Sequence, residues 1–219
     1  QKETLTIFMA SRLAIVLAII LAAVCAGCYE QQARPTGHVT TNFALKKTEE
    51  ADARLKEKAY DAALALADEA IADDPGCADA QALRGNALGH LGRFEEAAAA
   101  LMQAETLEPA TPFLPVVRGV YIERMGKPEE AQAAYAKGVD LYAALKAKQR
   151  LSPDESLGWA AAVYLSKGRN DGVIAFNDVL GHYPKLRSAL VLKERVVAND
   201  REYFMRWTMK DEGALEGNE

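Results

Sequence analysis

A 34-residue repeat constrains the fold of this chain more than any other feature. When the segment that begins at Tyr60 is shifted by 34 positions, aromatic, alanine and proline residues recur in phase. Four pairs define this register: Tyr60 and Phe94, Ala63 and Ala97, Ala70 and Ala104, and Pro75 and Pro109. A period of this length is typical of repeated helical hairpins, each of which needs a neighbour to bury its apolar face. The period therefore predicts an all-α stack of hairpins.

The composition agrees with a folded domain and disfavours one class of partner. The chain has 219 residues, of which 50% are hydrophobic, and a formal net charge of −5. This is enough apolar material for a sizeable core. Non-specific binding of nucleic acid requires clustered lysines and arginines, so the acidic balance argues against a nucleic-acid partner.

The best-preserved repeat, residues 78–109, resembles the tetratricopeptide repeat (TPR), and the resemblance extends over residues 42–184. In that family small residues lie where the two helices of a hairpin cross, glycine forms the turn and proline closes the unit. The resemblance implies these structural roles for eight residues: Gly85, Gly92, Ala97, Ala104, Pro109, Gly119, Gly126 and Ala131. The turn at Gly92 needs a positive φ, which glycine adopts with the least strain.

We therefore expect a TPR-like solenoid over residues 41–210, with about four hairpins followed by capping helices. The hairpins are predicted at 42–75, at 78–109, from 112 onwards and at 153–183. Ser152, Pro153 and Glu155 predict a capping box at the start of the fourth hairpin, whose second helix has Val173 where alanine is expected. The capping helices are expected to bury five apolar residues: Leu190, Val191, Val197, Phe204 and Trp207. The tail, 211–219, is expected to fray.

The first 28 residues have the pattern of a secretory signal peptide. Arg12 precedes an uncharged apolar run at 13–24, and the small pair Ala26-Gly27 before Cys28 resembles a bacterial lipobox. The resemblance implies that Cys28 is lipidated and becomes the mature N-terminus, with Met9 as a candidate start. Residues 29–40 lack apolar periodicity and are expected to form a flexible tether. The competing interpretation is an uncleaved transmembrane helix, but residues 13–28 are shorter than the ~20 residues that a bilayer requires.

The expected location follows from the residue after the lipidation site. Tyr29 stands where an aspartate would imply retention in the inner membrane, so we expect an outer-membrane lipoprotein that faces the periplasm. Because Cys25 would be removed and Cys28 would carry lipid, Cys77 would be the one free cysteine of the mature chain, which excludes an internal disulfide.

The sequence contains no recognisable catalytic, cofactor or metal motif. His38, His90 and His182 are far apart, without His-x₃-His spacing, and no Gly-rich phosphate loop is present. We therefore expect a protein that is not an enzyme and has no cofactor and no small-molecule substrate. The alternative is a catalytic or small-ligand protein that uses the groove of the solenoid.

The candidate binding site is the inner face, which in this repeat family is built from the first helix of each hairpin. Carried onto this chain, the resemblance implies seven groove residues: Asn86, His90, Phe113, Val116, Val120, Glu123 and Arg124. Phe113 and Val117 stand where a clamp for a peptide carboxylate needs basic residues, so an apolar helix fits this groove better. The alternative is that Phe113 and Val116 pack against the neighbouring hairpin.

A small basic patch is a second candidate. Lys146, Lys148 and Arg150 follow one another at the predicted end of the third hairpin. Cations also stabilise the C-terminus of a helix by themselves, which is the simpler interpretation of this patch.

The expected function is a lipid-anchored scaffold that holds a partner polypeptide in the periplasm. A role in assembling pili or secretins is the first choice, because an apolar groove on a short repeat array suits a helical ligand. The alternatives are an adaptor for a protease or an envelope enzyme, and a scaffold held by an uncleaved N-terminal helix.

Overall fold

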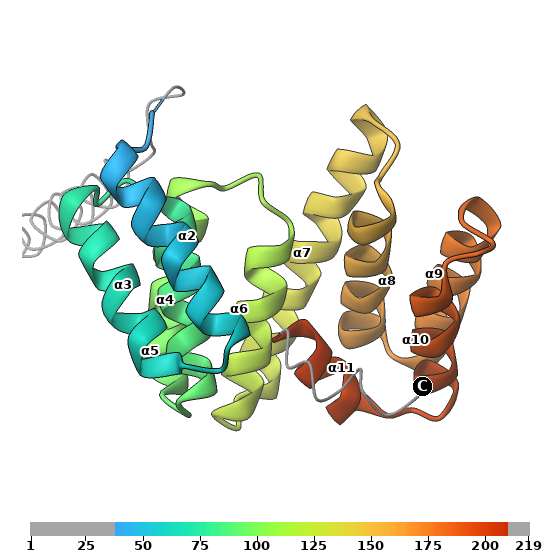
Figure 1. Cartoon of the computed structure of the whole chain (residues 1–219). Coiled ribbons are helices and arrows are strands. Elements are labelled where there is room, and N and C mark those ends of the chain that lie inside the picture. The colour runs from blue at the N-terminus through green and yellow to red at the C-terminus, as the bar shows by residue number, and fades with distance from the viewer. Residues whose placement is uncertain (1–37, 210–219) are drawn as a thin grey trace, which may run out of the picture. The chain divides into compact units, whose positions relative to one another are not determined.

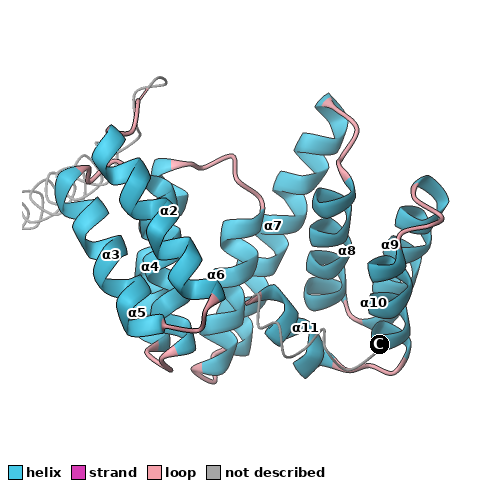
Figure 2. Cartoon of the chain, in the orientation of Figure 1, coloured by secondary structure: helices cyan, strands magenta, loops and turns pink. Residues whose placement is uncertain are grey.

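The computed structural model describes residues 38–209, which contain ten α-helices and no strand (Figures 1 and 2). In chain order the helices are α2 (Asn42–Lys56), α3 (Tyr60–Asp73), α4 (Ala78–His90), α5 (Phe94–Leu107), α6 (Phe113–Arg124), α7 (Pro128–Lys148), α8 (Pro153–Lys167), α9 (Arg169–His182), α10 (Arg187–Val197) and α11 (Arg201–Thr208). The predicted signal peptide at 1–28, most of the predicted tether and the tail at 211–219 lie outside the described residues.

Eight of these helices form the four predicted hairpins. The pairs α2–α3, α4–α5, α6–α7 and α8–α9 pack together, and each second helix also contacts the first helix of the next hairpin. The all-α solenoid predicted from the 34-residue period is therefore confirmed. The capping box at the start of α8 is confirmed as well: the Glu155 N–H donates to Ser152 Oγ (3.2 Å), and the Ser152 N–H donates to Glu155 Oε2 (2.7 Å).

The turns inside the first three hairpins share one backbone geometry. Lys58, Gly92 and Gly126 have φ values of 61°, 76° and 75°, in the left-handed region. At Gly92 the N–H donates to the Gly89 carbonyl, and the next N–H, from Arg93, donates to the Leu88 carbonyl. This pair of bonds is a Schellman motif, which satisfies carbonyls left free at the helix end. The positive φ at Gly92 is the one that the resemblance implies for this position.

The helices of a hairpin approach closely because small residues face each other at their crossing. A Cβ atom on Gly85 would lie 3.1 Å from the Ala97 carbonyl and 2.9 Å from Leu101 Cγ, so no larger residue fits. The fourth residue of each second helix is small and buried in all four hairpins: Ala63, Ala97, Ala131 and Gly172. The sixth residue from the end of each first helix is small as well: Ala51, Gly85, Gly119 and Ala162.

The fourth hairpin follows this rule through a residue that sequence reasoning passed over. The turn between α8 and α9 is the single residue Gly168, whereas each earlier turn has three residues, so the small position falls on Gly172 and not on Val173. A Cβ atom on Gly172 would lie 2.9 Å from Tyr164 Cβ. The apparent irregularity at Val173 is therefore a shift of register caused by the shorter turn.

The fifth pair, α10 and α11, breaks the rule. Leu192 and Phe204 occupy the two crossing positions that are small in the other hairpins, and both are fully buried. Because these side chains fill more space than glycine or alanine, α10 and α11 cannot approach each other as the earlier pairs do. α11 instead contacts α6 and α8 in addition to α10, and in Figure 1 it runs from the end of α10 back towards α6.

The capping region buries a different set of residues from the predicted one. Leu190 and Val197 are 47% and 45% exposed, so the prediction that they are core contacts is wrong. The buried side chains of α10 lie one or two positions away, at Ala189, Leu192 and Val196. Phe204 is buried as predicted, and Trp207 is half-buried against the same core.

Residues 38–41, at the end of the predicted tether, contact the first hairpin. His38 Nε2 lies 2.9 Å from Asp74 Oδ2, and the Thr41 N–H donates to the same oxygen. Burial works to raise the pKa of Asp74, but the hydrogen bonds from His38, Gly76 and Thr41 outweigh it and hold the pKa below its usual value. Residues 38–41 are therefore held to the C-terminal end of α3 by polar contacts.

Candidate functional site

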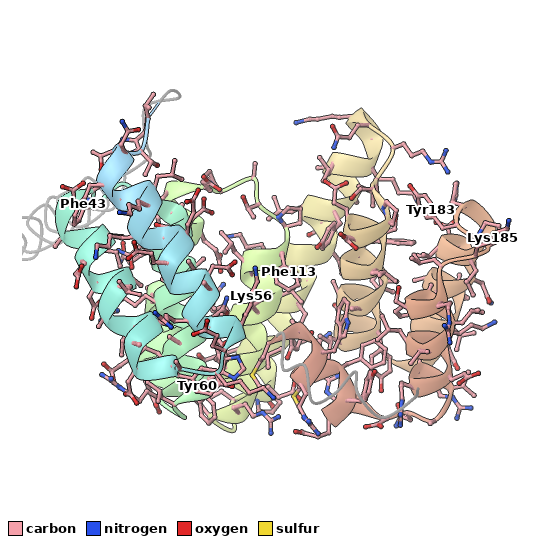
Figure 3. All side chains as sticks on the ribbon, in the orientation of Figure 1. Phe43, Lys56, Tyr60, Phe113, Tyr183 and Lys185 are labelled. Atoms are coloured by element: carbon pink, nitrogen blue, oxygen red, sulfur yellow. The ribbon has the colours of Figure 1, made fainter. Side chains whose placement is uncertain are left out.

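Of the seven predicted groove residues, two are buried and five are half-buried. Val116 and Val120 are 1% and 0% exposed and belong to the core that α6, α7 and α8 share, so they do not reach a ligand in this structure. Val116 fills the space beside Gly138, where an added Cβ would lie 2.4 Å from its Cγ2 atom. Phe113, at the start of α6 (Figure 3), is half-buried against the cluster that contains Leu88 and Tyr121. The alternative left open by the sequence is that Phe113 and Val116 pack against the neighbouring hairpin: Phe113 packs against a cluster that includes Leu88 of the second hairpin, whereas Val116 lies against Gly138 of its own hairpin.

The remaining four residues, Asn86, His90, Glu123 and Arg124, lie on α4 and α6. Together with Tyr164 and Leu165 of α8 they form what we call the first-helix face. Asn86 Oδ1 accepts a hydrogen bond from the buried Tyr121 hydroxyl (3.3 Å). The Tyr121 ring lies against Gly89, where an added Cβ would be 2.3 Å from the ring. Burial raises the pKa of Tyr121, so its hydroxyl stays protonated and donates.

His90 contacts the C-terminal segment of the chain. Its ring stacks on Tyr60, with ring centroids 4.5 Å apart and an interplanar angle of 3°. Its Nε2 atom lies 3.0 Å from the backbone carbonyl of Met209, and a carbonyl only accepts, so this nitrogen carries the proton. Met209 follows α11 directly and packs against the core clusters on both sides.

Glu123 makes the most specific polar contact on the face. Arg201, the first residue of α11, donates from Nε to Glu123 Oε1 (2.7 Å) and from Nη2 to Oε2 (2.8 Å), and the Tyr135 hydroxyl donates to Oε2 (2.8 Å). Such a forked arginine–carboxylate pair combines charge with strict geometry. Burial alone would raise the pKa of Glu123, but the hydrogen bonds from Arg201 and Tyr135 outweigh it and hold the pKa below its usual range.

Two further contacts anchor the start of α11. Arg201 Nη1 donates to the Leu165 carbonyl (3.1 Å), near the end of α8, where cations complement the helix dipole. Arg124, next to Glu123 on α6, pairs with Glu202, next to Arg201 on α11. Each helix thus has an acidic and a basic residue in adjacent positions, and the two helices form two ion pairs side by side.

An aromatic contact completes the site. Phe204 is fully buried, with its ring centroid 4.5 Å from that of Tyr164 and 5.9 Å from that of Phe176. Rings at these separations and tilted angles attract each other beyond the area that they bury. The Tyr164 hydroxyl also donates to Asn199 Oδ1 in the turn before α11 (3.3 Å). The first-helix face is thus covered by a short helix of the same chain, which the sequence pattern did not predict.

A separate cavity of about 210 Å³ lies between the ends of α7, α8 and α9. Two members of the predicted basic patch line it. Lys146 Nζ lies 2.7 Å from Asp178 Oδ2 and 4.2 Å from the ring centroid of Trp159, and the Arg150 guanidinium lies 5.1 Å from that of Tyr183 (Figure 3). These cations are engaged by the carboxylate and rings around them, which is a structural use.

Two kinds of feature are absent from residues 38–209. Within them no group of three or more histidine, cysteine, aspartate or glutamate side chains is placed to hold a metal ion. None of the helices described there has the length and apolar character needed to cross a bilayer.

Comparison with known proteins agrees with this architecture. Residues 54–112 match the sequence model of the tetratricopeptide repeat. A comparison with curated proteins gave no match. A thermophilic TPR protein of Thermus thermophilus is similar in structure, with a TM-score of 0.58 and 19% identity over 72% of this chain and 82% of that one.

Two further proteins of solved structure share the fold. PilW, described as a widely conserved type IV pilus biogenesis factor, has a TM-score of 0.57 and 16% identity, and the match covers 82% of this chain and 80% of that one. Pseudomonas aeruginosa PilF has a TM-score of 0.56 and 16% identity, over 80% and 77% of the two chains. At these identities the likeness concerns the fold. The described part of this chain therefore has the fold of a tetratricopeptide-repeat-like solenoid of helical hairpins, and residues 54–112 match the sequence model of that repeat.

Proposed function

We propose that this protein is a non-catalytic scaffold that binds a segment of a partner protein on its first-helix face. The observation that carries the proposal is that this face already holds a helix. α11 is seated there by the forked Arg201–Glu123 pair, by the Arg124–Glu202 pair and by Phe204 between aromatic rings. A surface that recognises a short helix through charge, geometry and an aromatic slot has the properties of a peptide-binding groove.

Photo-crosslinking from a single position tests this function. A photoreactive residue replaces Arg124, on the face, and in a control variant it replaces Arg187, an exposed residue on α10. We expect irradiation of envelope extracts from the source cells to give an adduct with one polypeptide from position 124 and none with that polypeptide from position 187. No adduct, or the same adduct from both positions, would contradict the proposal.

We further propose that the scaffold is an outer-membrane lipoprotein facing the periplasm and that it acts in assembling a pilus, a secretin or another envelope complex. The support is the signal-peptide pattern that ends at Cys28, and the fold shared with PilW and PilF. Lipid on Cys28 would hold the solenoid close to an assembling complex in the membrane.

Location and pathway have separate tests. Replacing Cys28 with serine should release the protein from membranes, and the mass of the mature N-terminus should show an acylated cysteine. An intact segment that contains Arg12 would contradict the lipoprotein and favour an uncleaved anchor.

Normal pilus and secretin assembly after deletion of the gene would remove that pathway and leave the scaffold function to be assigned to another complex.

A further inference from the structure

The turn before α11 is the same turn that joins the helices of the first three hairpins. Asn199 has φ 57°, the Asn199 N–H donates to the Val196 carbonyl, and the Asp200 N–H donates to the Arg195 carbonyl. This is the Schellman pattern seen at Gly92. The turn is therefore of the kind that elsewhere in the chain leads into an ordinary hairpin, but the helix that follows it, α11, contacts α6 and α8 as well as α10.

The charges at this contact define a direction and a register. Glu123 faces Arg201, and the next residue on each helix, Arg124 and Glu202, forms the second pair. If a bound helix shifted by one residue, like charges would meet on one side of the contact. Such a like-charge arrangement disfavours wrong partners as effectively as the correct pairs favour the right one.

The aromatic contact adds a third requirement. Phe204 follows Arg201 by three residues, and residues three apart lie on the same side of a helix. The guanidinium can therefore reach Glu123 while the ring fills the space beside Tyr164 and Phe176. A helix that satisfies the face needs an arginine, an acidic residue directly after it and an aromatic residue three positions after the arginine.

The length of α11 and the exposure of its ion pairs limit how strongly it is held in this site. It has eight residues, and helices of fewer than ~12 residues are marginal in water without tertiary contacts. The side chains of Arg201 and Glu202 are 36% and 54% exposed, so solvent competes for both pairs. Phe204, Met205 and Thr208 are the buried side chains of α11, and of these Phe204 makes the ring contacts with α8 and α9.

We propose that the first-helix face accepts in trans a short partner helix with the order arginine, acidic residue and, three positions after the arginine, an aromatic residue, and that α11 is an internal competitor for the same site. The inference rests on the proposed function and names its ligand class. A partner can bind only to molecules in which α11 is undocked. Its apparent association constant is therefore its intrinsic association constant multiplied by the fraction of such molecules. Weakening α11 should therefore strengthen binding in trans.

A labelled peptide with the sequence of residues 199–209 is the probe, and fluorescence anisotropy with the full chain is the readout. We expect the Arg201→Ala chain to bind the peptide about tenfold more tightly than the wild type does, as loss of one charge-assisted pair would allow. The Arg187→Ala chain, which loses an exposed charge from α10, should behave as the wild type. Adding Glu123→Gln to Arg201→Ala should abolish the gain, because the peptide's own arginine then has no carboxylate to bind.

Hydrogen exchange provides the second measurement. In the Arg201→Ala chain, residues 201–209 should exchange faster, while α6 keeps its protection, which shows that α11 has undocked from a folded solenoid. Equal peptide affinity for wild type and Arg201→Ala, no binding to either, or a gain that persists with Glu123→Gln would overturn the proposal.

The two proposals fail in different ways. If position 124 crosslinks to a partner whose yield is the same in wild type and Arg201→Ala, the scaffold stands and the competing role of α11 falls. If the peptide binds as expected but no cellular adduct forms, the site stands and the scaffold function falls.

Discussion

The Glu123–Arg201 pair should be measurably coupled in stability, and a double-mutant cycle gives the size of that coupling. The chains compared are the wild type, Glu123→Gln, Arg201→Ala and the double variant. Glutamine keeps an oxygen that can accept from Tyr135, so the cycle isolates the contact with Arg201. Hydrogen bonds that involve charged groups contribute about 1.5–3 kcal/mol when shielded from water.

The exposure of the pair reduces that figure. The two side chains are 36% and 20% exposed, so screening by solvent lowers the expected coupling to about 1–2 kcal/mol. The assay is urea unfolding followed by circular dichroism, with the coupling taken from the four free energies of unfolding. A coupling below about 0.3 kcal/mol, which is the additivity expected of independent sites, would refute the claim that this pair seats α11.

The geometry gives three further predictions. Gly119→Ala should destabilise the fold by about 1–3 kcal/mol in thermal unfolding, because a Cβ there would lie 2.6 Å from the buried Tyr135 ring. The control is Gly181→Ala, which has nothing within 4 Å of its added Cβ and should be neutral or stabilising by up to ~1 kcal/mol. Equal effects of the two substitutions would contradict the packing described here. Gly92→Ala should cost about 1 kcal/mol of unfolding free energy although its surroundings are open, since φ is 76°; no loss would show that the turn relaxes. The difference in unfolding free energy between wild type and Glu123→Gln should have its full value above pH about 4.3, the ordinary pKa of glutamate, because Glu123 is ionised there. It should shrink as the pH falls through the lowered pKa of Glu123 in the folded state. A difference that stays constant between pH about 7 and about 3 would argue against an ionised contact.

The sequence predicted the fold at positions where a single physical requirement selects the residue type. Alanine and glycine recur at 34-residue intervals because two helices cross there, and the same positions are in contact in the structure. The capping box at Ser152 and Glu155 and the turn at Gly92 could be predicted because each is a local backbone requirement. Together these features predict the four hairpins.

The binding face could be predicted only in part. The family pattern assigns positions on the first helix, and in the structure His90, Glu123 and Arg124 all contact α11 or the residue that follows it. It does not take account of Gly138, which leaves a space on α7 that draws Val116 into the core. The path of α11 has a sequence signal that we did not use: Leu192 and Phe204 are large at the two positions that are small in every other hairpin.

Zero-length crosslinking can establish directly that α11 lies on the first-helix face and not along α10. An Arg124→Lys chain is treated with a carbodiimide, which joins an amine to a carboxylate in contact, and the products are mapped by mass spectrometry. We predict an intramolecular link between positions 124 and 202, whose side chains pair in the structure. A link from Glu202 to Lys193 of α10, with none to position 124, would contradict this placement of α11.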